Sequence, residues 1–139
     1  MTEELSKPTE MNGISKSLGI EMTQFGNGTA KFNVVVDEKH LNKGGVAFGG
    51  LHASLVDSSM GAALVSTLKV SEWCATANLT INYLEASLPG VELVATGKIV
   101  RRGKNVAHLF GEIKDKTGLI HANATGVWTI WNNKPQKFR

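Results

Sequence analysis

Residues 40–68 read HLNKGGVAFGG followed by LHASLVDSSMGAALVSTL, a glycine-rich loop that leads into one long apolar segment. From Leu51 onward the apolar residues recur with helical rather than alternating spacing, which predicts a helix over residues 50–68. Small residues occupy most of the remaining positions, so other elements can approach this helix from several sides. We therefore expect a central helix that is buried almost all round, rather than an amphipathic helix on the surface.

The segments on both sides of this helix follow the two-residue period of strands. Two apolar stretches flank Gly26-Asn27-Gly28 within residues 20–36, which predicts a hairpin, and residues 11–18 precede it as a short helix ended by Gly19. Four further antiparallel strands are predicted between residues 74 and 131. Because a single long helix and a large antiparallel sheet must bury each other, the sequence predicts an α+β fold with the sheet curled around the helix.

The size and charge of the chain limit what kind of protein it is. It has 139 residues, 42% of them hydrophobic and 19% charged, which is typical of a globular domain. We expect residues 1–10 to form a flexible tail and residues 11–139 a single domain. The net charge of +3 is low for a nucleic-acid-binding surface. Without a signal-peptide core or an apolar run of roughly 18 residues, we expect a cytoplasmic protein with no membrane partner.

The cysteine and histidine residues show no pattern of a metal site. Cys74 is the only cysteine, which excludes an intrachain disulfide and a cysteine-rich metal site. The histidines His40, His52, His108 and His121 lack the spacing of metal ligands. We therefore expect neither a metal nor a cofactor, and we expect His52, on the central helix, to be packed or partly exposed.

Two features of the loop and helix indicate a catalytic site. Asp57 lies among apolar and small residues, where a carboxylate is costly to bury unless it is paired or used. Gly49 and Gly50 precede it at the start of the helix, where backbone N–H groups have no internal acceptor and a substrate oxygen meets no side chain. Such N–H groups can form an oxyanion hole. Alternatively, the two glycines only permit a tight turn into the helix.

The same residues resemble the signature of hotdog-fold acyl-CoA thioesterases of the phenylacetate-pathway (PaaI-like) type. That family's pattern is an asparagine, a glycine, a His-Gly-Gly step and an acidic residue eight positions beyond the first glycine of the pair. Asn42, Gly49 and Asp57 fall on this spacing, and the resemblance extends over roughly residues 14–131. One position departs from the pattern, since Phe48 stands where the family often has histidine.

The resemblance implies a role for each of these residues. Asp57 would act as the nucleophile or as the general base, and the Gly49 N–H would polarise the thioester carbonyl. Asn42 would hold the loop or the attacking water, and Thr76 would help to place water or be a plain strand threonine. Beside Gly50, the ring of Phe48 would form an apolar wall for the acyl group. The family also implies a homodimer or homotetramer whose active sites are shared between protomers.

Three cations cluster at a predicted hairpin, namely Arg101, Arg102 and Lys104. Clustered cations suit the phosphates of CoA, although such a cluster can also be a solvated turn.

Two other functions compete with thioester hydrolysis. One is a non-catalytic acyl-CoA-binding module on the same fold, which the retained Asp57 disfavours. The other is an acyl-CoA hydratase or dehydratase, which typically relies on a catalytic histidine and is disfavoured by Phe48. The sequence does not identify the acyl group.

Overall fold

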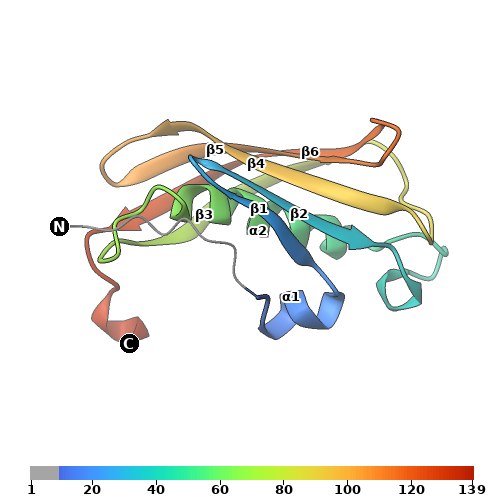
Figure 1. Ribbon diagram of the computed structural model, residues 1–139, viewed down its shortest axis with the longest axis horizontal. Coiled ribbons are helices and arrows are strands. Elements are labelled where there is room, and N and C mark those ends of the chain that lie inside the picture. The colour runs from blue at the N-terminus through green and yellow to red at the C-terminus, as the bar shows by residue number, and fades with distance from the viewer. Residues whose placement is uncertain (1–9) are drawn as a thin grey trace.

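The computed structural model describes residues 10–139 and shows an antiparallel sheet wrapped around one long helix (Figure 1). Apart from Glu10, the predicted N-terminal tail lies outside the described residues. The α-helices are α1 (Gly13–Leu18) and α2 (Gly49–Val65), the 3-10 helices are Glu38–His40 and Gln136–Phe138, and the strands are β1 (Glu21–Gly26), β2 (Thr29–Val35), β3 (Trp73–Tyr83), β4 (Glu92–Arg102), β5 (Val106–Lys114) and β6 (Ile120–Trp131).

The six strands lie in the order β1-β2-β4-β5-β6-β3, and every pair is antiparallel. The predicted α+β fold is therefore confirmed, as are the N-terminal hairpin and the four later strands. The β1–β2 turn has positive φ at both central residues, 54° at Asn27 and 77° at Gly28. Asn-Gly tolerates this conformation, whose twist matches that of the flanking strands. The order also leaves β1 and β3 as the two edges of the sheet.

One side of α2 packs closely onto the sheet. Its fully buried side chains include Leu51, Leu55 and Met60. A Cβ atom on Gly97 of β4 would lie 2.3 Å from the Ser59 carbonyl oxygen, so the missing side chain lets the helix backbone rest directly on the strand. This close approach fixes the depth of α2, and with it the position of every residue that α2 carries.

The other side of α2 is less buried than the sequence predicts. A stripe of small residues and Asp57 is only half-buried, so the prediction of burial almost all round is wrong for this side of the single chain. The apolar spacing did not distinguish the two sides because every residue of the stripe except Asp57 is small rather than charged. The stripe comprises Ala53, Ser54, Asp57, Ser58, Gly61 and Ala62.

The edge strand β3 contains a bulge that the sequence did not predict. Thr76 pairs with Trp128 and Asn78 with Val127, which leaves Ala77 without a partner on β6. A regular alternation along β3 would put Ala75, Ala77 and Leu79 on one face. Instead, the extra residue changes the face at Ala77, so that Thr76 before the bulge and Leu79 after it both point toward α2.

Candidate active site

Asp57 and Thr76 form the centre of the candidate site. Asp57 is half-buried on the small-residue stripe of α2, and its Oδ1 accepts a 2.7 Å hydrogen bond from the Thr76 hydroxyl. Small neighbours such as Ser54 and Gly61 leave the carboxylate accessible from the side that faces away from the sheet. The two residues that the sequence singled out on α2 and β3 are therefore brought together.

The start of α2 presents backbone N–H groups without side-chain caps. Phe48 is the N-cap residue, with φ −67° and ψ 148°, and its side chain makes no capping hydrogen bond. Gly49 is the first helical residue, so its N–H has no acceptor within the helix. The Phe48 ring packs over Gly50, where a Cβ atom would lie 2.2 Å from Phe48 Cε2. Gly50 is thus needed to accommodate the ring, and Phe48 remains 39% exposed beside the helix start.

Tyr83 is a component of the site that the sequence did not single out. Its hydroxyl donates a 2.7 Å hydrogen bond to the Gly49 carbonyl oxygen. A Cβ atom on Gly49 would lie 3.0 Å from that hydroxyl, so the ring lies directly against the glycine. Burial raises the pKa of Tyr83, which keeps its hydroxyl a donor. The only available signal was the alternation of β3, which puts Tyr83 on the helix-facing side.

An open pocket of about 640 Å³ lies beside this helix start. Its walls are the first residues of α2 and the segment that follows β3. The lining residues are Ala47, Gly49, Gly50, His52, Tyr83, Leu84, Glu85, Ala86 and Ser87.

Asn42 holds the loop that leads into α2. Its side-chain Oδ1 accepts hydrogen bonds from the Gly44 N–H at 2.9 Å and the Val46 N–H at 3.4 Å, and its backbone N–H donates to the Val46 carbonyl at 2.8 Å. The carboxamide oxygen is therefore engaged within the loop. Of the two roles predicted for Asn42, this geometry favours holding the loop.

Comparison with known proteins identifies the family. The family model described as Thioesterase superfamily matches residues 44–121, which include both the helix start and Asp57. The chain belongs to the thioesterase superfamily. A protein of Saccharolobus solfataricus, named only provisionally as an esterase, is 31% identical to this thioesterase over 96% of the chain and 93% of its own length. Acyl-coenzyme A thioesterase 13 of Mus musculus is 35% identical over 59% of the chain and 58% of its own length.

Solved structures agree with this family. The Escherichia coli PaaI protein from the phenylacetic acid degradation operon has a TM-score of 0.78 and 25% identity, covering 84% of this chain and 82% of its own. The smu.793 protein of Streptococcus mutans, solved bound to acetyl-CoA, has a TM-score of 0.76 and 25% identity, covering 84% of this chain and 91% of its own. The predictions of a hotdog fold, of a PaaI-like relationship and of a thioester hydrolase are confirmed.

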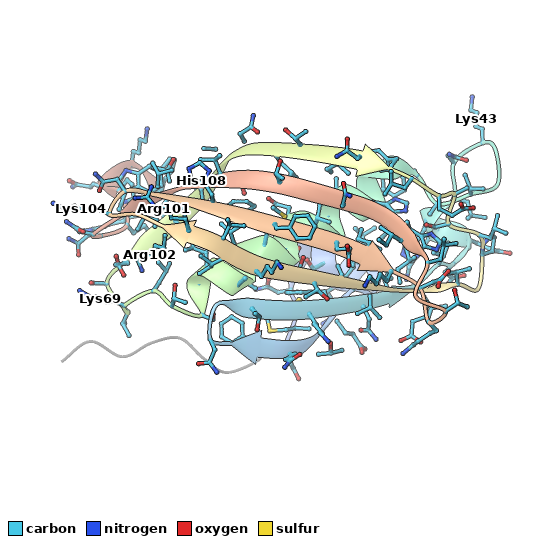
Figure 2. All side chains as sticks on the ribbon, turned by 90° about the horizontal axis from the view of Figure 1, so that it is seen from above. Lys43, Lys69, Arg101, Arg102, Lys104 and His108 are labelled. Atoms are coloured by element: carbon cyan, nitrogen blue, oxygen red, sulfur yellow. The ribbon has the colours of Figure 1, made fainter. Side chains whose placement is uncertain are left out.

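The cations predicted to bind CoA phosphates lie far from the helix start of the same thioesterase chain. Figure 2 shows Arg101, Arg102 and Lys104 gathered at one end of the sheet and Lys43, in the loop before α2, at the other end. Arg102 is already engaged, since its guanidinium donates to Glu72 at 2.5 Å and to the Thr67 carbonyl at 3.5 Å. Arg101 and Lys104 are exposed.

The ion pair between Arg102 and Glu72 also favours the ionised form of Glu72. Burial is the largest single influence and disfavours the Glu72 carboxylate, but the hydrogen bonds from Arg102 and the Lys69 N–H, together with the charges of Arg102 and Lys69, outweigh it and lower the pKa of Glu72. Arg102 thus ties the end of β4 to the segment after α2, and a role for it in binding phosphate would require this pair to open.

Other kinds of site were sought in residues 10–139. They contain no group of three or more His, Cys, Asp or Glu side chains that could hold a metal ion. None of the helices in this part of the chain is long and apolar enough to cross a membrane. Burial raises the pKa of the Cys74 thiol to about 11, so this cysteine is not a nucleophile at neutral pH.

Proposed function

We propose that this thioesterase hydrolyses acyl-CoA, releasing the free acid and CoA. The observation that carries the proposal is the half-buried Asp57 carboxylate, hydrogen-bonded to Thr76 on an otherwise uncharged helix. Support for the substrate class comes from the relatives, one named as an acyl-coenzyme A thioesterase and one solved with acetyl-CoA.

The proposed chemistry assigns one role to each end of the site. Asp57 either removes a proton from water as that water attacks the thioester carbon, or attacks the carbon itself. In both routes the carbonyl oxygen gains negative charge and the C–S bond then breaks, so that the thiolate of CoA leaves and takes up a proton. With water as the attacking group, the free acid forms directly. With Asp57 as the attacking group, the acyl group stays on Asp57 as a mixed anhydride, which water then hydrolyses to the free acid and the Asp57 carboxylate. The Gly49 N–H, at the positive end of the α2 dipole, would stabilise that negative oxygen.

A single chain cannot assemble both groups around one thioester. Asp57 follows Gly49 by eight residues, so the two residues are about 12 Å apart along the helix at a rise of 1.5 Å per residue. Both must come within about 3 to 3.5 Å of neighbouring atoms of the same carbonyl group. We therefore infer that Asp57 of one protomer works with Gly49 of its partner, across two antiparallel copies of α2.

Two surfaces of the single chain fit this arrangement. The small-residue stripe around Asp57 is half-buried, and Thr76, Ala77 and Asn78 on the edge strand β3 are exposed. In an antiparallel pair, the partner's helix start would approach the end of the sheet that carries Arg101 and Lys104. The predicted phosphate-binding role of these cations would then belong to a site shared by two chains. A homodimer, alone or paired into a tetramer, follows from the proposal.

The experiment that tests the function is the release of free CoA thiol from a panel of acyl-CoA substrates. The panel includes short, medium-length, branched and aromatic acyl groups, and each substrate is tested with the wild-type protein and with Asp57→Asn. We expect at least one acyl group to be hydrolysed by the wild type and not by the variant. Absence of thiol release from every substrate, or equal release by Asp57→Asn, would contradict the proposal.

A further inference from the structure

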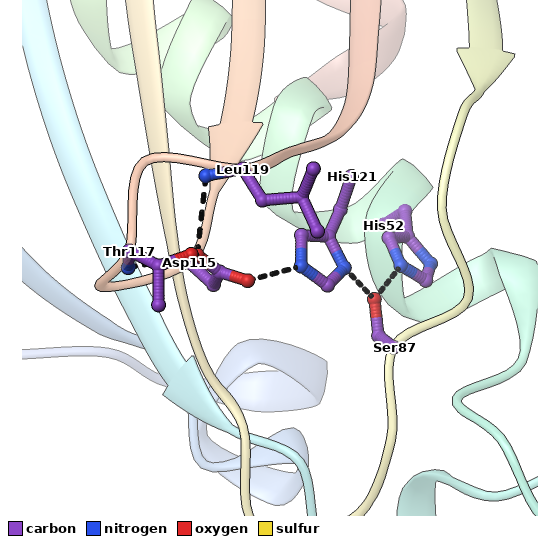
Figure 3. Close-up of polar contacts among 6 residues, drawn as sticks. All are labelled: His52, Ser87, Asp115, Thr117, Leu119 and His121. Atoms are coloured by element: carbon purple, nitrogen blue, oxygen red, sulfur yellow. Dashed lines mark hydrogen bonds and ion pairs between the residues drawn. The ribbon is translucent and has the colours of Figure 1, made fainter.

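A chain of four polar side chains links the turn between β5 and β6 to the first turn of α2 (Figure 3). Asp115 Oδ2 lies 2.9 Å from His121 Nε2, and the Ser87 hydroxyl lies 2.8 Å from both His121 Nδ1 and His52 Nε2. His52, Ser87 and His121 are at most 3% exposed. Although the order of groups resembles a Ser-His-Asp triad, Ser87 is buried and its hydroxyl is shared by two imidazoles, so it is not a nucleophile.

The outer end of the chain determines the direction of its hydrogen bonds. Asp115 Oδ1 accepts hydrogen bonds from the Thr117 hydroxyl, the Thr117 N–H and the Leu119 N–H. The hydrogen bonds from Thr117 and then from His121 hold the pKa of Asp115 well below its usual range. The ionised carboxylate can only accept, so His121 Nε2 must donate to it. When the His121 ring carries this single proton, its Nδ1 accepts from the Ser87 hydroxyl, and Ser87 in turn accepts from His52 Nε2.

In this arrangement the inner end of the hydrogen-bonded network is a His52 ring whose single proton lies on Nε2, so that Nδ1 carries none. Burial lowers the pKa of His52, although the nearby Phe48 carbonyl acts in the opposite sense. Nδ1 itself is buried and makes no hydrogen bond within residues 10–139. A buried polar network with one unsatisfied atom stabilises a core less than apolar side chains of the same size would. Packing alone therefore does not explain why these four polar residues are there.

His52 contacts the residues that shape the start of α2. The Phe48 carbonyl belongs to the same peptide unit as the Gly49 N–H, so the tautomer of His52 affects the group that would serve as the oxyanion donor. The His52 ring also packs edge-on against Tyr83, with ring centroids 5.5 Å apart, and Tyr83 binds the Gly49 carbonyl. The hydrogen-bonded network thus ends at His52, which lies next to the peptide unit before Gly49 and next to Tyr83, the residue that binds the Gly49 carbonyl.

We propose that Asp115, His121, Ser87 and His52 form a positioning network that sets the tautomer of His52 and, through it, the orientation of the Phe48–Gly49 peptide. The assignment rests on the proposed function in one respect, since the Gly49 N–H is the oxyanion donor there. The four residues act through Gly49 and Tyr83, and they are positioning residues rather than catalytic ones.

The substitution Asp115→Asn tests the network from its outer end. The amide oxygen can replace Oδ1 toward Thr117 and Leu119, whereas the amide NH₂ group replaces Oδ2 and presents a donor to His121 Nε2. His121 must then carry its proton on Nδ1, Ser87 must donate to His52 Nε2, and His52 must carry its proton on Nδ1, beside the Phe48 carbonyl. A substitution at a surface turn is thus expected to move a proton on a histidine three hydrogen bonds away.

Nitrogen-15 NMR of the 139-residue protein shows which ring nitrogen of His52 carries the proton, and it needs no substrate. We expect the His52 proton on Nε2 in the wild type and on Nδ1 in Asp115→Asn, together with a shifted Gly49 amide signal. In kinetics with the best acyl-CoA, we expect kcat to fall about tenfold while KM stays within about twofold, the pattern of an interaction made in the transition state. The NMR readout distinguishes failure of the network from failure of the proposed function, which Asp57→Asn tests separately.

The matched control is Thr117→Val, which removes a hydroxyl that donates to the same Asp115 carboxylate but leaves the direction of the chain unchanged. We expect this variant to keep the wild-type His52 tautomer and kcat. If Asp115→Asn leaves the His52 and Gly49 signals as in the wild type, or lowers kcat no more than Thr117→Val does, the network is only structural and the proposal is wrong.

Discussion

Thr76 on the edge strand β3 donates a 2.7 Å hydrogen bond to Asp57 on α2. The bulge at Ala77 accounts for this contact, because it changes the face of β3 between Thr76 and Asn78. β-Bulges are over-represented next to active sites, where they redirect a side chain. Here the redirected hydroxyl binds one carboxylate oxygen, and in the proposed mechanism the other oxygen meets the thioester or water.

Replacement of the carboxylate separates catalysis from stability. We expect Asp57→Asn and Asp57→Ala to lower the rate of thioester hydrolysis by at least about two orders of magnitude, the scale of positioned acid–base chemistry. We expect thermal unfolding to change little, because removing a partly buried carboxylate also removes its desolvation cost. Steady-state kinetics and melting temperatures measure the two effects. Near-normal turnover by Asp57→Ala would show that the site has been assigned incorrectly.

The Thr76 hydroxyl is tested by a pair of substitutions. Thr76→Val keeps the shape of the side chain and removes the donor to Asp57, whereas Thr76→Ser keeps the donor. Because hydrogen bonds to charged groups contribute about 1.5 to 3 kcal/mol, we expect kcat to fall at least about tenfold in Thr76→Val and to be largely retained in Thr76→Ser. Equal activity of the two variants would mean that Thr76 only fills its place in the strand.

Proline at position 49 removes the proposed oxyanion donor selectively. Proline is favoured at the first helical position, and the extended ψ of 148° at Phe48 suits a residue that precedes proline. We expect Gly49→Pro to lower kcat by about 10² to 10³, as removal of a single oxyanion donor does elsewhere. The control Gly49→Ala has a Cβ atom at the same place, 3.0 Å from the Tyr83 hydroxyl, but keeps the N–H. If both variants lose the same activity, the crowding of Tyr83 is responsible.

The proposed shared site predicts that two variants, each expected to be inactive alone, complement each other in a mixed dimer. In a heterodimer of Asp57→Asn and Gly49→Pro, one of the two sites carries both changes and the other carries neither. Free exchange of protomers makes about half of the dimers mixed, so we expect about a quarter of the wild-type activity to return. Light scattering at micromolar concentration should show a dimer or tetramer for each variant. An active monomer, or a mixture without activity despite proven exchange, contradicts the shared site.

Local patterns in the sequence were sufficient to predict most of the helices and strands of the fold. Helical spacing predicts α2, the Asn27-Gly28 turn predicts the first hairpin, and alternation predicts the later strands. The bulge at Ala77 could not be predicted, because it depends on how β3 pairs with β6 on a distant part of the chain. The same reason applies to the partial exposure of α2, since nothing in its own spacing tells which side the sheet covers.

Most of the candidate site that could be predicted lies on one local segment, and Thr76 on β3 was indicated only by the family resemblance. Asn42, Gly49 and Asp57 occur within one loop and helix, and their spacing resembles a known family. Tyr83 contacts Gly49 across 34 residues, and Ser87 contacts His52 across 35. Contacts at such separations arise from the three-dimensional fold and leave no periodic signal in the sequence.

The departure from the family pattern at Phe48 gives the final prediction. The ring packs over Gly50 beside the helix start and remains 39% exposed, so it can meet an acyl group that approaches the Gly49 N–H. If the ring forms an apolar wall, Phe48→Ala removes binding that is equally strong before and during the reaction. We therefore expect it to raise KM for bulky acyl groups, by a loss of about one to three kcal/mol of binding, with little change in kcat.

The variant Phe48→His tests whether a side-chain hydrogen-bond donor at position 48 increases turnover. It restores the side-chain donor that the family often has near the carbonyl, so turnover should rise or stay level. Kinetics of both variants on one short and one bulky acyl-CoA decide between a wall and a packing residue. A wall changes the ratio of kcat/KM between the two substrates in Phe48→Ala, because only the bulky acyl group reaches the ring. A lower melting temperature with an unchanged ratio would leave Phe48 as a residue that only packs the loop onto Gly50.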